Sequence, residues 1–171
     1  MTRNVGIYIF DEIEVLDLGG PFEVFSTASR MKARLHPGAA KPFEVFTCAE
    51  TLRPVRARGG LLVQPAFDLT NHRAIDVFIV PGGVVTAELK RDNVIEWITR
   101  TAAKASLTAS VCTGAFLLAK AGLLRGKTIT HIGRTSRTSV RCFRTSRCET
   151  TRAGWTPGRS SRPLASPPVS T

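Results

Sequence analysis

The segment 107–121 constrains the fold of this chain more than any other, because a cysteine stands where its pattern changes. Residues 107–111 are a short apolar run that predicts a strand, and residues 115–121 have the composition of a helix. Cys112 therefore lies at the corner between strand and helix, where Gly114 allows a tight turn of the backbone. Such corners expose the nucleophile of α/β enzymes, the serine version being G-x-S-x-G. Cys112 is accordingly a candidate nucleophile.

Two interpretations of Cys112 remain open from the local pattern. A thiol at a helix N-terminus lies near the positive end of the helix dipole, which favours the reactive thiolate. A small buried cysteine that closes a strand would give the same pattern, since free cysteine is among the most buried residue types. The rest of the chain has to decide between them.

The remaining pattern predicts alternating strands and helices. Continuous apolar runs favour strands that are buried on both faces of a parallel sheet, and they occupy residues 4–10, 43–48 and 75–80. Residues 93–105 have helical spacing, and Pro21 suits the first turn of a helix. We therefore expect an α/β fold with a doubly wound, mostly parallel sheet, a flavodoxin-like three-layer sandwich.

Shorter elements are expected between these units. Residues 55–63, with two glycines at their centre, predict a hairpin. Residues 67–69 favour a short turn, and residues 127–130 begin another strand. In doubly wound sheets ligands bind at the carboxyl ends of the strands. Asp17, Gly82, Gly83 and Cys112 all follow predicted strands, so we expect them to converge on one site.

The basic character of the chain is concentrated at its end. The formal net charge is +11, and residues 131–171 contribute eight arginines against one acid, Glu149. A nucleic-acid arm is one interpretation of such a charge run. Only Phe143 and Trp155 are aromatic in this stretch, which is a poor platform for stacking bases, so nucleic-acid binding is not expected.

The chain changes character after Thr130, where Arg, Ser, Thr and Pro dominate and no strand or helix pattern continues. A disordered basic tail is one explanation. The genetic code offers another: if one base is lost near the Thr130 codon, free third bases allow a reading that begins T-H-W-E-D-V-E-D-L-R, as a strand end and an amphipathic helix would. We therefore expect a C-terminally incomplete domain at residues 1–130 and a disordered or out-of-frame basic tail at residues 131–171. His131 then has no catalytic role.

Three segments carry a resemblance to a known family. Residues 110–127, S-V-C-T-G-A-F-L-L-A-K-A-G-L-L-R-G-K, resemble the nucleophile segment of the PfpI/ThiJ superfamily, whose members are class I glutamine amidotransferase-like. Residues 15–25, V-L-D-L-G-G-P-F-E-V-F, resemble its first loop and helix, and residues 76–83, D-V-F-I-V-P-G-G, its third strand and glycine turn. The chain is most similar to isocyanide-hydratase-like proteins and to the amidotransferase-like domains of AraC-type regulators.

This resemblance implies a cofactor-free cysteine enzyme of the hydratase or lyase type. Cys112 would be the nucleophile and Asp17 the acid/base partner, hydrating isocyanides to N-formamides or acting on another small electrophile such as a reactive aldehyde. Backbone N–H groups of Gly82 and Gly83, helped by Thr113, would bind a developing negative charge or the substrate. From the residues alone, a helix N-cap before Pro21 is the favoured interpretation of Asp17, and the resemblance reverses this preference.

Other expectations concern the setting of the site. A ligand-sensing domain related to AraC-type regulators is the alternative function, and an inactive truncated product is a third possibility. The partners expected are a small-molecule substrate and a second copy in a homodimer. No signal peptide or membrane-length apolar run is visible, so we expect a cytoplasmic protein without membrane contact. We expect no metal, no cofactor and no disulfide among Cys48, Cys112, Cys142 and Cys148.

Overall fold

The computed structural model describes residues 1–125, together with the backbone of residues 128–132 and 147–151. Its centre is a five-stranded sheet in which every neighbouring pair of strands is parallel. The strands lie in the order β5-β2-β1-β6-β7 and comprise β1 (Arg3–Tyr8), β2 (Phe43–Ala49), β5 (Phe67–Asp68), β6 (Val77–Val80) and β7 (Leu107–Ser110). The predicted doubly wound parallel sheet is confirmed. The turn expected at residues 67–69 is wrong, because β5 pairs there with the end of β2.

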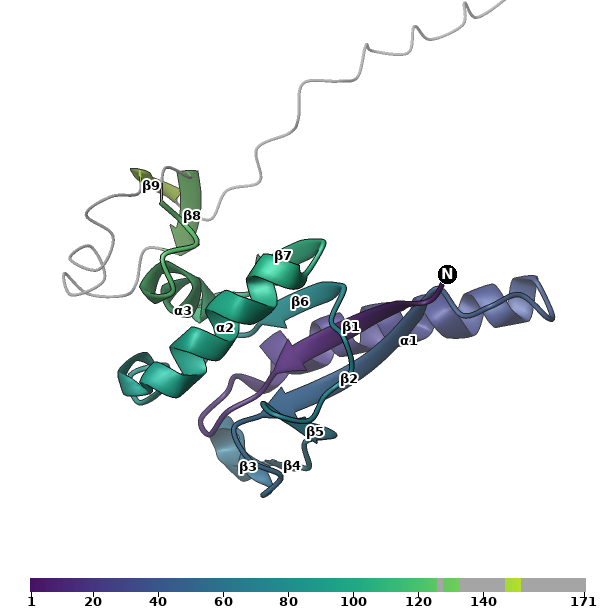
Figure 1. The fold of residues 1–171 in the computed structure, drawn as a ribbon, viewed down its shortest axis with the longest axis horizontal. Coiled ribbons are helices and arrows are strands. Elements are labelled where there is room, and N and C mark those ends of the chain that lie inside the picture. The colour runs from purple at the N-terminus through teal and green to yellow at the C-terminus, as the bar shows by residue number, and fades with distance from the viewer. Residues whose placement is uncertain (126–127, 133–146, 152–171) are drawn as a thin grey trace, which may run out of the picture.

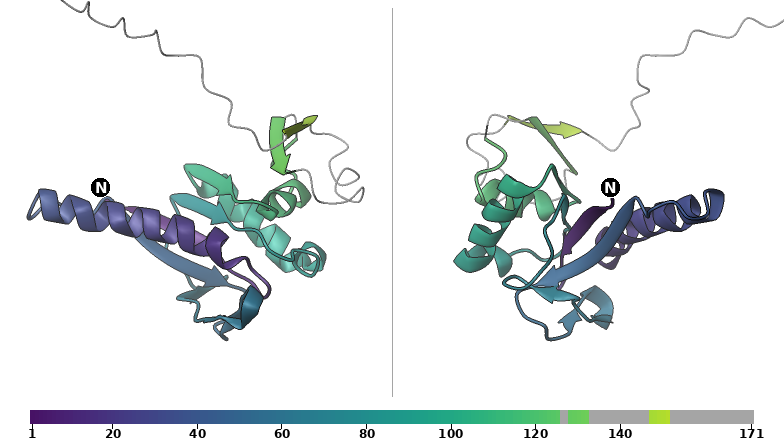
Figure 2. Two further views of the ribbon diagram at one scale, coloured as in Figure 1. Left: turned by 180° about the vertical axis from the view of Figure 1, so that it is seen from behind. Right: turned by 45° about the vertical axis from the view of Figure 1, so that its right-hand side comes forward.

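Helices lie on both faces of this sheet (Figures 1 and 2). Helix α1 (Val15–Leu35) runs along one face, and α2 (Asp92–Lys104) lies on the other. Helix α3 (Gly114–Lys120) follows β7, and a 3-10 turn, η2 (Glu88–Lys90), precedes α2. The predicted hairpin is present as β3 (Val55–Arg56) and β4 (Leu62–Val63) around the 3-10 turn η1 (Arg58–Gly60). This is the expected three-layer arrangement.

Burial explains why these runs form the central strands. The side chains of Val5, Ile7 and Ile9 are fully buried, and all four residues of β6 are buried. Strands covered on both faces need continuous apolar sequence rather than alternation, which is the pattern that identified them. Strand β7 is less covered: Leu107 is exposed, as expected at the edge of a sheet.

Helix α1 begins earlier than Pro21 suggested. Its first residue is Val15, so Pro21 lies inside the helix and Asp17 lies in the first turn. A proline has no N–H to donate to the carbonyl four residues before it, which here is that of Asp17. The position of Pro21 therefore did not predict the first residue of the helix to within several residues. Tertiary contacts of residues 12–14 determine where the helix begins.

Two short strands follow α3. Strand β8 (Thr128–Ile132) pairs in parallel with β9 (Arg147–Thr151), apart from the five-stranded sheet. The expectation of no regular element after the strand at residues 127–130 is therefore wrong for β9, whose two threonines are β-branched and favour extended backbone. Most of residues 131–171 lie outside the described residues, so the out-of-frame interpretation stays a prediction. Of the helices described, none has the length and apolar character needed to cross a bilayer.

Candidate active site

Cys112 stands on a strained corner between β7 and α3. Its φ angle is +50°, a left-handed conformation that few residues with a side chain adopt. A hydrogen bond of 3.0 Å from Val111 N to Val80 O holds the corner to β6. Cys112 is exposed rather than buried. A strained residue that presents its side chain to solvent is typical of a nucleophile corner, so the buried-cysteine interpretation is wrong.

Gly114 has a different task from the one expected. A Cβ built on it would lie 2.0 Å from the carbonyl oxygen of Val80 and 2.7 Å from that of Pro81. The glycine is therefore needed because the start of α3 packs directly on the end of β6, and the left-handed turn is made by Cys112 itself. This close packing brings the corner against the glycine turn that follows β6.

Asp17 reaches the same place from the first turn of α1. Its Oδ2 accepts a hydrogen bond of 3.2 Å from Gly82 N, and the carboxyl group lies near enough to the Cys112 thiol for the thiol to influence its titration. Burial raises the pKa of Asp17, the Gly82 N–H lowers it, nearby Glu14 raises it and the Cys112 thiol lowers it; the net direction is upward. The residue that occupies the N-cap position of α1 is Glu14, not Asp17. The cap interpretation of Asp17 is thus wrong, and its carboxyl group faces the cysteine.

The glycine turn holds the side chains of the site. Gly83 N donates to Thr113 Oγ1 at 2.9 Å, and the Thr113 hydroxyl lies 2.9 Å from the Gly83 carbonyl oxygen, to which it donates. The N–H groups of both glycines are therefore engaged by Asp17 and Thr113. The N–H of Thr113 itself has no hydrogen-bond partner in the described part of the chain. Of the three expected donors, the Thr113 N–H is therefore the one best placed to stabilise a negative charge that develops on a substrate. The oxyanion role of the two glycine N–H groups stays a prediction.

The loop that joins β1 to α1 is held on two sides. Glu12 N donates to Arg56 O at 2.8 Å, and Arg58 N donates to Ile13 O at 3.0 Å, which bonds the loop to the hairpin. On the other side, Glu14 N donates to Gly82 O at 2.9 Å and Val84 N to Glu12 O at 3.0 Å. Residues 12–14 thus bridge the hairpin and the glycine turn, and they fix where α1 starts.

Charged pairs reinforce this contact. Asp11 accepts a hydrogen bond of 2.7 Å from Arg53 and one of 2.9 Å from Arg56 N, and Arg58 Nη1 lies 3.1 Å from Glu14 Oε2. The sequence reasoning missed these pairs. The signal was present, because an acidic loop at residues 11–14 is matched by three arginines at residues 53–58.

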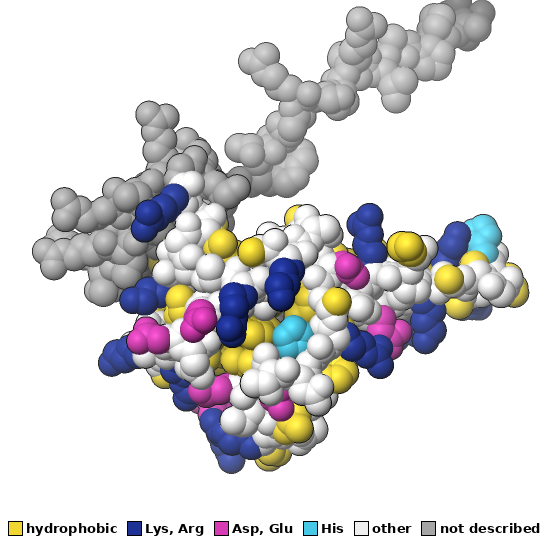
Figure 3. Space-filling model, in the orientation of Figure 1, with side chains coloured by type: hydrophobic (Ala, Val, Ile, Leu, Met, Phe, Trp, Pro, Cys, Tyr) yellow, Lys and Arg dark blue, Asp and Glu magenta, His cyan; other side chains and the backbone are white. Residues whose placement is uncertain are grey.

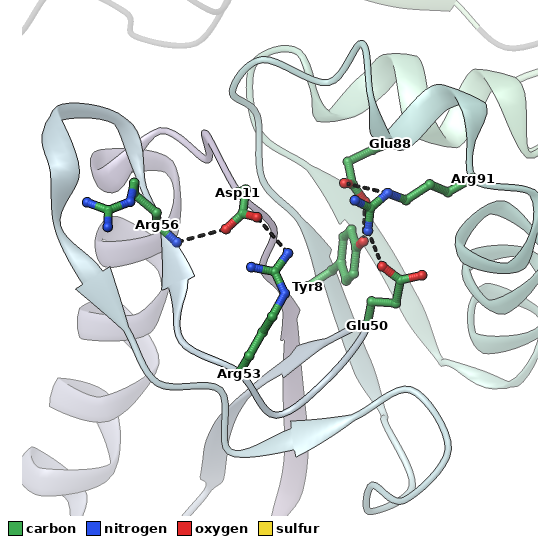
Figure 4. Close-up of polar contacts among 7 residues, drawn as sticks. All are labelled: Tyr8, Asp11, Glu50, Arg53, Arg56, Glu88 and Arg91. Atoms are coloured by element: carbon green, nitrogen blue, oxygen red, sulfur yellow. Dashed lines mark hydrogen bonds and ion pairs between the residues drawn. The ribbon is translucent and has the colours of Figure 1, made fainter.

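A second polar cluster joins the loops at the carboxyl edge (Figure 4). Glu88 is buried and accepts a hydrogen bond from the hydroxyl of Tyr8, while Arg91 Nε lies 3.5 Å from its other oxygen. Arg91 also pairs with Glu50 from the loop after β2. Burial raises the pKa of Glu88, against the Tyr8 hydrogen bond and the Arg91 charge. The cluster anchors the segment that follows the glycine turn, and nothing in the sequence marked it.

Two residues with no predicted role have structural partners. His72 Nε2 accepts a hydrogen bond of 3.0 Å from Trp97 Nε1, beside a cavity of about 460 Å³ between α2 and the loop before β6. Figure 3 shows apolar surface there between basic side chains and a histidine. Glu23 forms an exposed ion pair with Arg30.

Within residues 1–125 and the two described strands beyond them, no three His, Cys, Asp or Glu side chains gather as a metal site would require. The absence of a cofactor stays a prediction.

Fold and site together define a class: an α/β protein with an exposed cysteine at a strand–helix corner and a carboxyl group beside it, at the carboxyl edge of a parallel sheet. Comparison with known sequences agrees, because the DJ-1/PfpI family matches residues 3–140. The chain belongs to the DJ-1/PfpI family. The match includes every site residue named above and extends past Thr130.

Several relatives show how far the likeness goes. Isonitrile hydratase of Pseudomonas putida is 31% identical over 131 residues, covering 76% of this chain and 52% of that protein. An uncharacterized protein in the cpoL 5' region of Streptomyces lividans is 35% identical over 142 residues, covering 82% of this chain and 95% of that protein. The HTH-type transcriptional regulator GbdR of Pseudomonas aeruginosa is 28% identical over 125 residues, 72% of this chain and 32% of the regulator.

A solved structure supports the fold. A ThiJ/PfpI family protein from Pseudomonas syringae superposes with a TM-score of 0.65 at 23% identity, covering 77% of this chain and 50% of that one. The chain thus spans about half the length of isonitrile hydratase and of this structural relative. What such relatives do as whole proteins is therefore a separate question from the family.

Proposed function

We propose that this chain is a cofactor-free cysteine enzyme that hydrates a small electrophile, with isocyanides as the first class to test. The observation that carries the proposal is the position of a partly buried Asp17, which Gly82 N holds beside the Cys112 corner and whose pKa burial raises. A nucleophile and a protonated acid in contact can attack and protonate one substrate carbon in concert. The 31% identity to isonitrile hydratase supports the choice of substrate class.

The reaction can be written with its atoms balanced. Cys112 Sγ attacks the terminal carbon of R–N≡C, and the proton of Asp17 goes to that carbon, which gives a thioimidate on the enzyme. Water adds to the same carbon, its proton passing to the substrate nitrogen. The C–S bond then breaks, which releases R–NH–CHO, and the remaining proton returns to the Cys112–Asp17 pair. The net change is the addition of one water to the isocyanide.

The test uses the 171-residue chain with an alkyl isocyanide and follows the N-formamide by chromatography. We expect turnover by the parent chain and none by Cys112→Ala, because attack requires the sulfur. The matched control is Cys48→Ala, which removes a buried thiol outside the site. Formamide production by Cys112→Ala at the parent rate would overturn the proposal.

The likeness to GbdR favours a second candidate, a ligand-sensing domain. In that case the site would bind a small molecule without turning it over. Saturable binding of the isocyanide by Cys112→Ala and the parent chain alike, with no formamide from either, would support this candidate and reject the enzyme.

A further inference from the structure

Arg58 and Glu14 form an ion pair at the start of the helix that carries Asp17. Arg58 Nη1 is 3.1 Å from Glu14 Oε2, and both side chains are about half exposed. Glu14 is the N-cap residue of α1, and its carbonyl accepts a hydrogen bond of 3.1 Å from Asp17 N. Its own N–H donates to Gly82 O, so the backbone of Glu14 contacts both members of the Asp17–Gly82 hydrogen bond. No catalytic step proposed above uses either Arg58 or Glu14.

Backbone hydrogen bonds of the hairpin fix the position of Arg58. Arg58 N donates to Ile13 O at 3.0 Å, and Ala57 N donates to Leu61 O at 2.8 Å across the turn. Ala57 is fully buried, so the residue directly before Arg58 is fixed in the core.

We propose that Arg58 and Glu14 are positioning residues that set the pH at which Asp17 loses its proton. The charged and titratable groups that act on Asp17 are Glu14, at the N-cap of its helix, and Cys112 at the corner; Arg58 pairs with Glu14 and does not contact Asp17. The negative charge of Glu14 favours the protonated form of Asp17, and the positive charge of Arg58 opposes it. The hairpin therefore acts on the acid without contacting it.

The magnitude follows from distance and solvent. Glu14 has extended backbone at the N-cap, one hydrogen-bonded turn before Asp17, which puts the two side chains on the order of 6 Å apart. A unit charge at that range in high dielectric is worth on the order of half a pH unit in the titration of its neighbour. We expect Glu14→Gln to move the Asp17 midpoint down by about this much and Arg58→Gln to move it up, because Glu14 is then uncompensated. High salt should weaken both shifts.

The experiment reads Asp17 directly. The sequence contains five aspartates, so ¹³C labelling of aspartate carboxyl groups gives five signals, and Asp17→Asn identifies its signal by loss. Titration curves are recorded for the parent chain, Glu14→Gln, Arg58→Gln and the double variant, which should return close to the parent midpoint. Arg53→Gln is the matched control, since it removes another arginine, just before the hairpin, that pairs with the same loop at Asp11.

The catalytic meaning of this inference rests on the proposed function, which assigns Asp17 as the acid. The outcomes of the titrations separate the two. Opposite shifts in the two single variants, with Arg53→Gln unchanged, support the inference whether or not any isocyanide is turned over. An Asp17 midpoint that ignores both variants, or that Arg53→Gln moves equally, would overturn it even in an active enzyme. Where turnover is seen, the pH at which the rate declines should move with the midpoint.

Discussion

The carboxylate of Asp17 and the backbone N–H of Gly82 are joined by a 3.2 Å hydrogen bond across 65 positions of sequence. Asp17 lies in the first turn of α1, and Gly82 follows β6, which pairs directly with β1. A Cβ on Gly82 would lie 2.7 Å from Thr113 N and 2.8 Å from Asp17 Oδ2. Gly82 therefore occupies the point where the three parts of the site meet, and its lack of a side chain is what lets them meet.

Gly82→Ala should lower any Cys112-dependent rate by about two orders of magnitude, the scale of a misplaced catalytic group. Its methyl group would push Asp17 and Thr113 apart, since both contacts are far shorter than ordinary van der Waals distances. Initial rates of formamide production measure the effect. An alanine variant with parent activity would show that the Asp17–Gly82 contact is dispensable.

The control for this variant is Gly19→Ala. Gly19 lies in α1, and no atom lies within 4 Å of a Cβ built on it. Alanine is favoured over glycine in a helix interior by about 1 kcal/mol, so this variant should unfold at a higher temperature and keep its rate. Loss of activity in both variants would point to α1 as a whole rather than to the position of Gly82.

The two cysteines of the described core should react very differently with iodoacetamide. Cys48 is buried in β2, and burial raises its pKa to about 12, with a further contribution from Asp68. Its thiol should stay protonated and unreactive up to about pH 10, whereas the exposed Cys112 is labelled. Peptide mapping by mass spectrometry after brief labelling distinguishes the sites. Equal labelling of both would contradict the buried position of Cys48.

Tyr8→Phe should destabilise the fold by about 1–3 kcal/mol, the cost of leaving a buried acceptor without its donor. The hydroxyl of Tyr8 donates to Glu88, whose side chain is buried at the carboxyl edge. Chemical denaturation measures the loss. In a Glu88→Gln background the same change should cost less, because no charged acceptor remains; an equal cost in both backgrounds would mean that the two side chains do not interact.

The parallel sheet and the meeting of Asp17, Gly82 and Cys112 could be predicted because both follow from local pattern and topology. Continuous apolar runs identify buried strands, and the carboxyl ends of parallel strands share one edge. The corner at Cys112 could also be predicted from local pattern, because an apolar strand run there passes directly into a helical segment. What could not be predicted is which atoms of these residues contact each other, because the glycine N–H groups bond side chains from two other elements.

The missed elements share a physical cause. Strand β5 is two residues long and forms because it pairs with the end of β2. The start of α1 depends on contacts of Glu12 and Glu14 with the hairpin and the glycine turn. Periodicity carries no information on such contacts. The burial of Glu88 is a further case, since a charged residue in a loop ordinarily predicts a solvent-exposed side chain.

Asp17→Asn should lower the rate by about two orders of magnitude or more, as expected for a lost general acid. In the parent chain the rate should fall as the pH rises through the raised pKa of Asp17, because the acid form is then depleted. The variant cannot titrate at this position and should lose that alkaline limb. Rates measured between pH 4.5 and pH 9 test both points, and an Asn variant with an unchanged profile would leave Asp17 without a catalytic role.

The same variant should be more stable than the parent chain at neutral pH. Burial is the largest influence on Asp17 and raises its folded pKa above that of the unfolded chain, so stability falls as the pH rises through the interval between the two values and stays lower above it. Asparagine carries no charge and avoids this loss. The difference in Tm between variant and parent should therefore be small near pH 4 and larger at pH 7.

Asp68→Asn is the control of opposite sign. The Thr70 hydroxyl and the N–H groups of Thr70 and Asn71 lower the Asp68 pKa, so loss of the Asp68 carboxylate should destabilise the protein at pH 7. A parent chain more stable than Asp17→Asn at pH 7 would show that the carboxylate of Asp17 is satisfied by its partners and is not held as an acid.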